Sequence, residues 1–257
     1  LNNFCFQNPT KLIMGKGMIA QLSKEIPTDK KIMITFGGGS VKRNGVYEQV
    51  KEALKDHQTI EFWGIEPNPA IETLREANFK KYRFLLWELV KKGEADKTVP
   101  LGTVLTIPAT GSEMNNGAVI SCKETKEKFA FFSNFPKFSI LDPEVTFSLP
   151  DYQIACGIAD TFVHVMEQYL TKSGESRVMD RWAESILQTL VEIAPKIKEN
   201  KQDYQNMADF MMCATMALNG FIAMGVSQDW ATHMIGHEVT ALTGLTHGHT
   251  LAIILPG

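Results

Sequence analysis

The spacing of the hydrophobic residues changes near residue 150, and this change constrains the fold more than any other feature of the sequence. Before it, short apolar runs rich in β-branched residues alternate with helix-like segments. After it, four long segments carry the helical period and contain few β-branched runs. Strands that alternate with helices favour a mostly parallel sheet covered by helices. The sequence therefore predicts an α/β domain over residues 1–150 and an all-helical domain over residues 151–257.

The apolar pattern also places individual elements. In the first part, strands are expected over Lys31–Phe36, Thr59–Trp63, Arg83–Leu86 and Val104–Ile107, with a helix over Val46–His57. In the second part, helices are expected over Tyr152–Lys172, Val178–Asn200, Tyr204–Met224 and Trp230–Thr243.

Composition excludes several classes of function. Hydrophobic residues make up 44% and charged residues 21% of the 257 positions, as in an ordinary globular protein, and the net charge is −3. No basic surface for a nucleic acid or an anionic membrane is indicated. The apolar stretch from Phe210 to Val226 contains Asn219 near its middle, so we interpret it as a buried helix and not as a membrane span. The four cysteines show no CxxC pairing, which predicts reduced thiols in a cytoplasmic protein.

Histidines gather in the second half of the chain. Four of the six fall within 17 residues, at His233, His237, His247 and His249. A fifth, His164, lies one helical turn after Asp160. Residues four apart project from one face of a helix, so two helices and a histidine on the following Gly-rich loop, Thr243–His249, could surround one divalent cation. Imidazole and carboxylate together suit Zn²⁺ or Fe²⁺. Spacing alone does not decide which four residues bind the metal, and His237 fits as well as His233.

A glycine turn follows the expected strand Lys31–Phe36. Gly37-Gly-Gly-Ser40 lacks Cβ atoms at three positions, so its backbone N–H groups can approach an anion, although a plain tight turn fits equally. No acidic residue follows closely to bind a ribose 2′-hydroxyl. Lys42 and Arg43 stand there with Ser40, and suit either the 2′-phosphate of NADP or an ordinary solvated face. A second hydroxyl-rich turn, Thr106–Glu113, contacts a cofactor or caps the next element. These patterns fit a dehydrogenase, a metallohydrolase or a lyase.

Several segments match, in order, the pattern of one known family. They are Asn8–Gly17, Gly37–Gly45, Gly64–Pro69, Pro108–Glu113, Leu141–Pro143, Asp160–His164, Asp229–His237 and Gly244–His247. On these segments the sequence resembles the iron-containing, group III alcohol dehydrogenases, and within them the butanol-dehydrogenase-like NADPH-dependent aldehyde reductases. The resemblance implies a dehydroquinate-synthase-like fold, with a Rossmann-like α/β cofactor domain, a helical metal domain and an active site between them.

The resemblance also implies roles for single residues. The metal ligands that it implies are Asp160, His164, His233 and His247, with His237 as a nearby catalytic residue. The residues implied to contact the adenosine ribose and its 2′-phosphate are Gly38, Gly39 and Ser40, and those implied to line the cofactor cleft are Thr106, Thr110 and Lys128. The implied reaction transfers hydride between NADP(H) and a primary alcohol or aldehyde such as butanol or butanal, with Fe²⁺ or Zn²⁺ as a Lewis acid. Relatives suggest a homodimer.

The sequence departs from the family pattern at two places. Family members carry a second Gly-rich run, which binds the cofactor pyrophosphate, after the strand that corresponds to Phe84–Leu86. Here Leu86 is followed by Trp87–Gly93, which corresponds to a later part of the pattern. A βα unit is therefore expected to be missing near residues 86/87. The helical domain is expected to be incomplete after Gly257.

Two other functions compete with this interpretation. A metallo-lyase of the dehydroquinate synthase type shares the fold, the metal and the nicotinamide cofactor, but its substrate pocket is rich in Lys and Arg. The residues next to the metal positions here are apolar, which favours small apolar alcohols and aldehydes: Phe162, Val163, Trp230, Met234, Leu242 and Leu245. The second alternative is a metal-stabilised, non-catalytic remnant, which the missing segments make conceivable.

Overall fold

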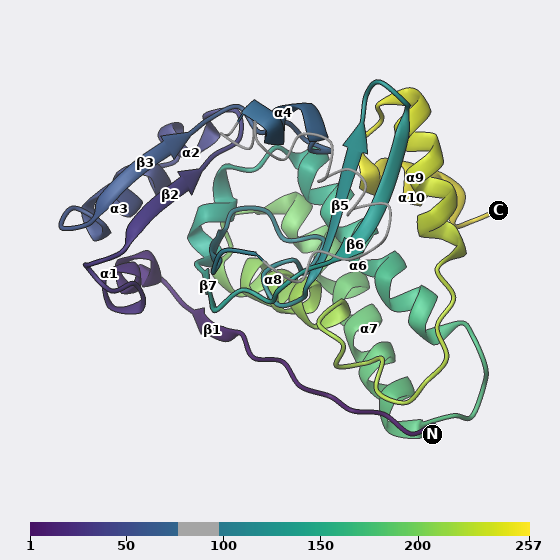
Figure 1. Ribbon diagram of the computed structural model, residues 1–257. Helices are drawn as coiled ribbons and strands as arrows, with labels where there is room; N and C mark the ends of the chain where they lie inside the picture. Colours follow the sequence, from purple (N-terminus) through teal and green to yellow (C-terminus); the bar gives the residue numbers. More distant parts are fainter. Residues whose placement is uncertain (77–97) are drawn as a thin grey trace.

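The computed structural model describes residues 1–76 and 98–257, and its strands and long helices separate along the chain as the sequence predicts (Figure 1). The described strands are β1 (Lys11–Met14), β2 (Lys31–Thr35), β3 (Gln58–Phe62), β4 (Gly102–Leu105), β5 (Gly117–Cys122), β6 (Glu127–Phe132) and β7 (Phe138–Leu141). The short helices among them are η1 (Met18–Gln21), α1 (Leu22–Glu25), α2 (Ser40–Arg43), α3 (Val46–Ala53), α4 (Ile71–Glu76) and η3 (Pro143–Ser148). The later helices are α6 (Asp151–Tyr169), α7 (Arg177–Glu199), α8 (Tyr204–Ala217), α9 (Ala231–Thr243) and α10 (His247–Ile254). The expected strand Arg83–Leu86 and the expected gap near residues 86/87 lie outside the described residues.

Two of the three described sheets are parallel. β7 lies between β1 and β4 and is parallel to both, and β2 is parallel to β3. Parallel neighbours need a crossover connection, which is why helices alternate with these strands. All four residues of β7 are buried, as expected of a strand covered on both faces. The predicted α/β architecture with a mostly parallel sheet is confirmed.

The third sheet was not predicted. β5 and β6 form an antiparallel hairpin in register from Gly117 opposite Phe132 to Cys122 opposite Glu127. Lys126 closes the turn with a φ of 56°, in the left-handed region that few residues other than glycine adopt. β6 packs beside α9, so the hairpin brings the residues of β6 to the helical part of the molecule (Figure 1).

The α/β part and the helical part of the chain each have an apolar core of their own. In the first part, residues of η1, α1 and α3 pack on β7: Ile19, Leu22, Val46, Val50, Leu54, Phe138, Ile140 and Val145. In the second part, α6, α7 and α8 share a core that contains Ile154, Leu190, Ile193, Ile197, Met207, Phe210 and Cys213. Each cluster removes apolar side chains from water, which is the main favourable contribution to folding. The first residues of the chain lie along the helical part, where the Asn2 backbone N–H donates to the Gly225 carbonyl.

The three largest differences from the expected elements concern two helices and one loop. The expected helix Val46–His57 ends at Ala53 because the chain turns, with the His57 N–H donating to the Leu54 carbonyl. The expected helix Tyr204–Met224 ends at Ala217, since the Asn219 side chain accepts from the Phe221 N–H and Gly220 has a φ of 85°.

The third difference concerns the expected loop Thr243–His249. Its second half is the start of helix α10, so His247 is a helical residue and not a loop residue. Gly244 ends α9 with a φ of 71°, and the chain re-enters a helix after Thr246. Among the described helices, none combines the length and the apolar character that crossing a membrane requires.

Candidate functional site

One face of α6 supplies three acidic or imidazole side chains to the interior. Asp160, His164 and Glu167 follow one another at intervals of four and three residues, so they share a helix face. All three are buried. A buried ionisable group needs a partner or a ligand, because the loss of water strongly disfavours its charge. This face therefore indicates a site.

The helices α9 and α10 bring the remaining histidines to that face. His233 and His237 lie one turn apart on α9, and His247 is the first residue of α10. α10 approaches α6 closely because Gly248 has no Cβ: a Cβ there would lie 2.2 Å from the Cys156 carbonyl oxygen. Glycine at this position thus permits the approach that places His247 beside α6.

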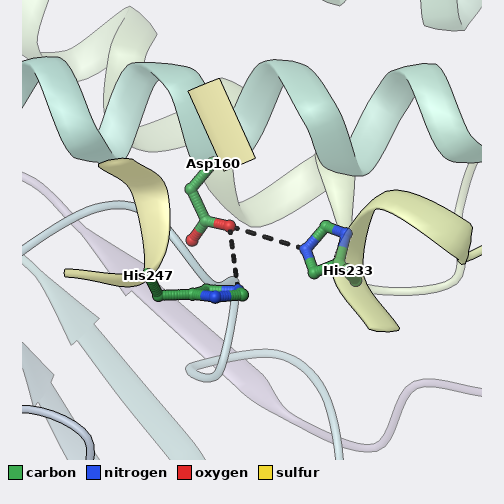
Figure 2. Close-up of side chains that lie close together, drawn as sticks. All are labelled: Asp160, His233 and His247. Carbon is green, nitrogen blue, oxygen red and sulfur yellow. Dashed lines mark ion pairs between the residues drawn. The ribbon is translucent and has the colours of Figure 1, made fainter. Parts of the chain in front are cut away.

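The Asp160 carboxylate lies at the centre of the assembled group (Figure 2). Its Oδ1 is 3.6 Å from His233 Nε2, 3.7 Å from His247 Nε2 and 3.7 Å from His164 Nδ1. Asp160, His233 and His247 offer ligand atoms that all lie within 4.8 Å of one another. This is the arrangement of a group that could hold one metal ion, drawn from three helices.

The polar atoms of this group lack hydrogen-bond partners among the described residues. They are Asp160 Oδ1, His164 Nδ1, His233 Nε2 and His247 Nδ1. Distances of 3.6–3.7 Å between the carboxylate and the rings are too long for hydrogen bonds. Buried polar atoms are normally paired, so such a set of orphaned atoms fits a bound cation. Imidazole and carboxylate suit Zn²⁺ or Fe²⁺.

The charges of the group also suit a cation. Burial alone raises the pKa of Asp160, but His164, His233 and His247 together outweigh it and lower that pKa to about 2. Burial lowers the pKa of His164 to about 4 and that of His247 to about 3. Near neutral pH the carboxylate is therefore charged and these two rings are neutral, which are the forms that bind a metal.

The predicted ligand His164 lies next to the group of three. Its ring stacks on that of His233, with centroids 4.5 Å apart and planes inclined by 26°. The predicted catalytic residue His237 is also at the site, with its ring centroid 5.2 Å from that of His247. Burial and the charge of Lys128 lower the pKa of His237 to about 4. His249 turns elsewhere, because its Nδ1 meets the Tyr152 hydroxyl at 3.1 Å.

Lys128 reaches the site from β6. It is 8% exposed, and its ammonium donates to Asn68 Oδ1 at 3.1 Å. Burial lowers its pKa to about 8, although the Asp160 carboxylate acts in the opposite direction. A strand residue from the first part of the chain thus faces the helical cluster.

The turn Thr106–Glu113 lies against the same segment of α6. A Cβ at Gly157 would be 2.4 Å from the Pro108 carbonyl oxygen, and the Thr161 hydroxyl lies 3.5 Å from the Ala109 carbonyl. Because Gly157 and Thr161 flank Asp160, the turn that carries Thr106 and Thr110 runs past the metal face of the helix. The contacts of these two threonines with a cofactor stay predictions.

The glycine turn after β2 lies apart from this cluster, on the left of Figure 1. Gly39 has a φ of 86° and precedes the single turn of α2, which begins at Ser40. Gly38 and Ser40 are exposed, Gly39 is half-buried, and the space around a Cβ at Gly38 or Gly39 is open. The roles of Gly38, Gly39 and Ser40 in binding a nucleotide stay predictions.

Glu167 is the residue of the site that sequence reasoning missed. Its carboxylate accepts the backbone N–H of His233 at 3.0 Å and also contacts His233 Nδ1. Burial lowers the pKa of His233, but Asp160 and then Glu167 outweigh it and raise that pKa above its ordinary value. The spacing of Glu167 from Asp160 and His164 on one helix face was the available signal.

The apolar residues that we grouped with the metal positions are mostly elsewhere. Trp230 lies against the cluster, with its ring centroid 5.3 Å from that of His233. Phe162 and Val163 line a cavity of about 690 Å³ between α6, α7 and α10. Met234, Leu242 and Leu245 are exposed. Residues that are neighbours in a helical sequence point in different directions, which the linear argument overlooked.

The chain matches the models of one protein family over most of its length. Residues 154–257 match the Fe-containing alcohol dehydrogenase family, C-terminal, and residues 76–143 match iron-containing alcohol dehydrogenase. It is 47% identical over 290 aligned positions to the NADPH-dependent aldehyde reductase YqhD of Escherichia coli, covering 100% of this chain and 75% of the relative. It is 39% identical to the probable NADH-dependent butanol dehydrogenase 2 of Bacillus subtilis, covering 100% of this chain and 74% of the relative.

Solved structures give the same result. The crystal structure of YqhD from E. coli K-12 matches with a TM-score of 0.95 at 46% identity, over 100% of this chain and 74% of that one. The NADH-dependent butanol dehydrogenase A of Thermotoga maritima matches with a TM-score of 0.93 at 35% identity, over 99% and 73%. The alignment with the E. coli sequence is longer than the 257 residues of this chain, so the relative has internal residues without a counterpart here. The absence of a βα unit near residues 86/87 stays a prediction.

Proposed function

This chain belongs to the iron-containing alcohol dehydrogenase family, and from that membership we propose that it transfers hydride between NADP(H) and a primary alcohol or aldehyde, such as butanol or butanal. The observation that carries the proposal is the group of Asp160 and His233, which are buried, and His247, which is half-buried; their ligand atoms lie within 4.8 Å of one another. Its orphaned oxygen and nitrogen atoms fit a divalent cation.

The proposed metal ligands are Asp160, His164, His233 and His247, and the proposed metal is Fe²⁺ or Zn²⁺. When bound, such a metal supplies a Lewis acid for the substrate oxygen, and the nicotinamide supplies or accepts the hydride. Of these four, the protein holds the ligand atoms of Asp160, His233 and His247 within 4.8 Å of one another. The ionised carboxylate and neutral rings of Asp160, His164 and His247 need no proton loss near neutral pH.

His237 is the proposed catalytic residue. Its ring lies beside that of His247, and its pKa of about 4 keeps it neutral near pH 7. A neutral imidazole carries one N–H and one lone pair, so it can pass a proton between the substrate oxygen and a second group without holding a charge. Lys128, the buried ammonium near it, provides a positive charge beside a developing negative oxygen.

The proposed cofactor is NADP(H), bound through Gly38, Gly39, Ser40, Thr106, Thr110 and Lys128. The relatives include both NADPH-dependent and NADH-dependent enzymes by name, so the proposed preference rests on this chain's own residues. Lys42, two residues after Ser40, holds its ammonium 4.2 Å from the Trp63 ring centroid and 5.4 Å from that of Tyr47. These cation–π contacts keep a positive charge beside the glycine turn, where it can bind a 2′-phosphate.

The proposed substrate is a small apolar alcohol or aldehyde. Trp230 is the apolar side chain that lies against the cluster, with its ring 5.3 Å from His233 and 6.2 Å from His164. The name of the E. coli relative, an aldehyde reductase, supports the same class of substrate.

We further propose that the protein is a cytoplasmic homodimer. The four free cysteines are consistent with the cytoplasm. Light scattering can test the homodimer.

The test is NADPH oxidation with butanal, measured before and after EDTA treatment and after metal is added back. Metal-dependent turnover, faster with NADPH than with NADH, supports the proposal. Cofactor binding without aldehyde turnover supports the lyase alternative. A protein that binds metal but neither binds nor oxidises the cofactor supports the non-catalytic alternative.

A further inference from the structure

Glu167 is a buried carboxylate that directs both of its oxygens at one residue. It is 6% exposed, and its Oε1 accepts the backbone N–H of His233 at 3.0 Å. Its Oε2 contacts Nδ1 of the same histidine. Its own backbone carbonyl accepts the Asp229 N–H at 2.9 Å, just before α9 begins. Glu167 therefore fastens the first turn of α9 to α6.

The contact at Nδ1 fixes the direction of the His233 ring. With Nδ1 against Glu167, Nε2 faces Asp160 Oδ1 at 3.6 Å and has no hydrogen-bond partner within the described ranges. A carboxylate accepts hydrogen bonds only, so it favours the tautomer that carries its proton on Nδ1. The lone pair is then on Nε2, which is the atom that faces the other proposed ligands.

The other two histidines around Asp160 are held differently. Nδ1 of His164 and Nδ1 of His247 have no hydrogen-bond partner in the part of the chain that the structure describes. Within residues 1–76 and 98–257, the His233 ring is the one of these three that contacts a second carboxylate besides Asp160. His233 is therefore the ring whose orientation and tautomer are set by the protein itself.

We infer that Glu167 is a positioning residue that fixes His233 in the Nδ1–H tautomer with Nε2 aimed at the metal position. The inference rests on the proposed metal site and adds to it a residue outside the ligand set. A second partner of this kind orients a ligating imidazole and makes it a stronger donor, and its loss weakens metal binding about 10- to 100-fold.

The substitution Glu167→Gln tests this with little change in shape. The amide oxygen of glutamine can accept either the backbone N–H or the Nδ1–H of His233, but the amide nitrogen is a donor and must face the other group. If the amide nitrogen donates to Nδ1, the His233 ring carries its proton on Nε2, which is the atom where the metal would bind. The matched control is Glu184→Gln, because Glu184 accepts a hydrogen bond from Tyr169 at 2.9 Å in the same helical part, away from the cluster.

The measurement is the Zn²⁺ dissociation constant from competition with a chelator, with urea unfolding to compare the folded fractions. We expect it to rise about 10- to 100-fold in E167Q and to stay unchanged in E184Q. An E167Q protein that is folded and binds Zn²⁺ as the wild type does would overturn the inference. A wild-type protein that binds no Zn²⁺ would instead overturn the proposed metal site.

A second readout does not depend on the E167Q variant. In ¹⁵N spectra of the Zn²⁺-loaded wild-type protein, assigned with a His233→Gln variant, His233 should show a protonated Nδ1 and a metal-shifted Nε2. A protonated Nε2, or a metal-shifted Nδ1, would contradict the inference even if E167Q failed to fold.

Discussion

The metal cluster and the glycine turn are the two regions proposed to act together, and they are built in opposite ways. The cluster consists of buried or half-buried side chains from three helices, and several of its polar atoms lack partners among the described residues. The glycine turn is largely exposed, lies between β2 and a single turn of helix, and offers backbone groups and surface side chains. A buried cluster with unpaired polar atoms limits the ligands that it can take, whereas an exposed turn admits several.

This difference explains why membership of the family supports the metal site more firmly than it supports a preference for one cofactor. The ionised Asp160 beside the neutral rings of His164 and His247 suits a cation. The relatives' names agree on alcohol or aldehyde chemistry but divide between NADPH and NADH. We therefore expect substitutions in the cluster to abolish function, and those at the turn to change the preference for a cofactor.

The largest effect is expected from Asp160→Asn. The carboxylate oxygen is within 3.7 Å of a nitrogen on each of three histidines, and its charge is what a cation would neutralise. Loss of the metal removes several kcal/mol of transition-state stabilisation, so kcat/KM for butanal should fall at least about 1000-fold. Metal analysis should find no bound ion in the variant. An active, metal-loaded D160N protein would contradict the claim that the Asp160 carboxylate is required to bind the metal.

Lowering the pH should destabilise the metal-free protein through the buried cluster. The folded-state pKa values of His164, His237 and His247 are about 4, 4 and 3, below the ordinary 6.5, so the unfolded state binds more protons between these values. Stability is therefore full above pH 6.5 and falls as the pH drops towards 4, by on the order of 1 kcal/mol per pH unit for each ring. The raised pKa of His233 acts above pH 6.5, where protonation of this ring favours the folded state as the pH falls, so it adds little to the slope below pH 6.5.

Urea unfolding at pH values from 7.5 to 4.5 measures this effect. His247→Asn should reduce the slope, since it removes one of the three groups. A stability that stays constant between pH 6.5 and 4.5 would show that the rings are not buried in the neutral form.

Alanine substitutions at two glycines, one in each region, compare the packing of the two regions. A Cβ at Gly248 would lie 2.2 Å from a backbone oxygen of α6, whereas one at Gly38 meets nothing within 4 Å. Alanine is favoured over glycine in a helix by about 1 kcal/mol, but the clash with backbone is larger. We expect G248A to lower the free energy of unfolding by about 1–3 kcal/mol and to weaken Zn²⁺ binding. G38A should stay within about 0.5 kcal/mol of the wild type. Equal stabilities of the two variants would show that α10 does not depend on this close approach.

The smallest effect is expected at the turn, from Lys42→Ala. An exposed charge pair contributes up to about 1 kcal/mol, so kcat/KM for NADPH should fall roughly fivefold while that for NADH stays unchanged. Lys55→Ala is the matched control, because Lys55 is an exposed lysine that pairs with Glu52 away from the turn. An equal loss with both cofactors would mean that Lys42 does not contact the 2′-phosphate.

The sequence was sufficient where the relevant spacing is local. The pairs Asp160/His164 and His233/His237 follow from helical geometry alone, as does the change of architecture near residue 150. Glu167 could not be assigned a partner, because its contact with His233 depends on how α9 packs against α6. The first residues of α10, His247–His249, were expected in a Gly-rich loop, yet Gly248 is a helical residue that permits a close approach to α6. The hairpin that brings Lys128 to the cluster depends on pairing between strands, which the spacing of apolar residues does not specify.

The most direct test of the central claim is a metal titration of the metal-stripped protein, followed by butanal-dependent NADPH oxidation and by the amount of metal bound. We predict that activity is absent without metal and returns in proportion to added Fe²⁺ or Zn²⁺ until one ion is bound per chain. Full activity without a bound ion, or one equivalent bound in Asp160→Asn as in the wild type, would contradict a catalytic metal held by Asp160 and its histidines.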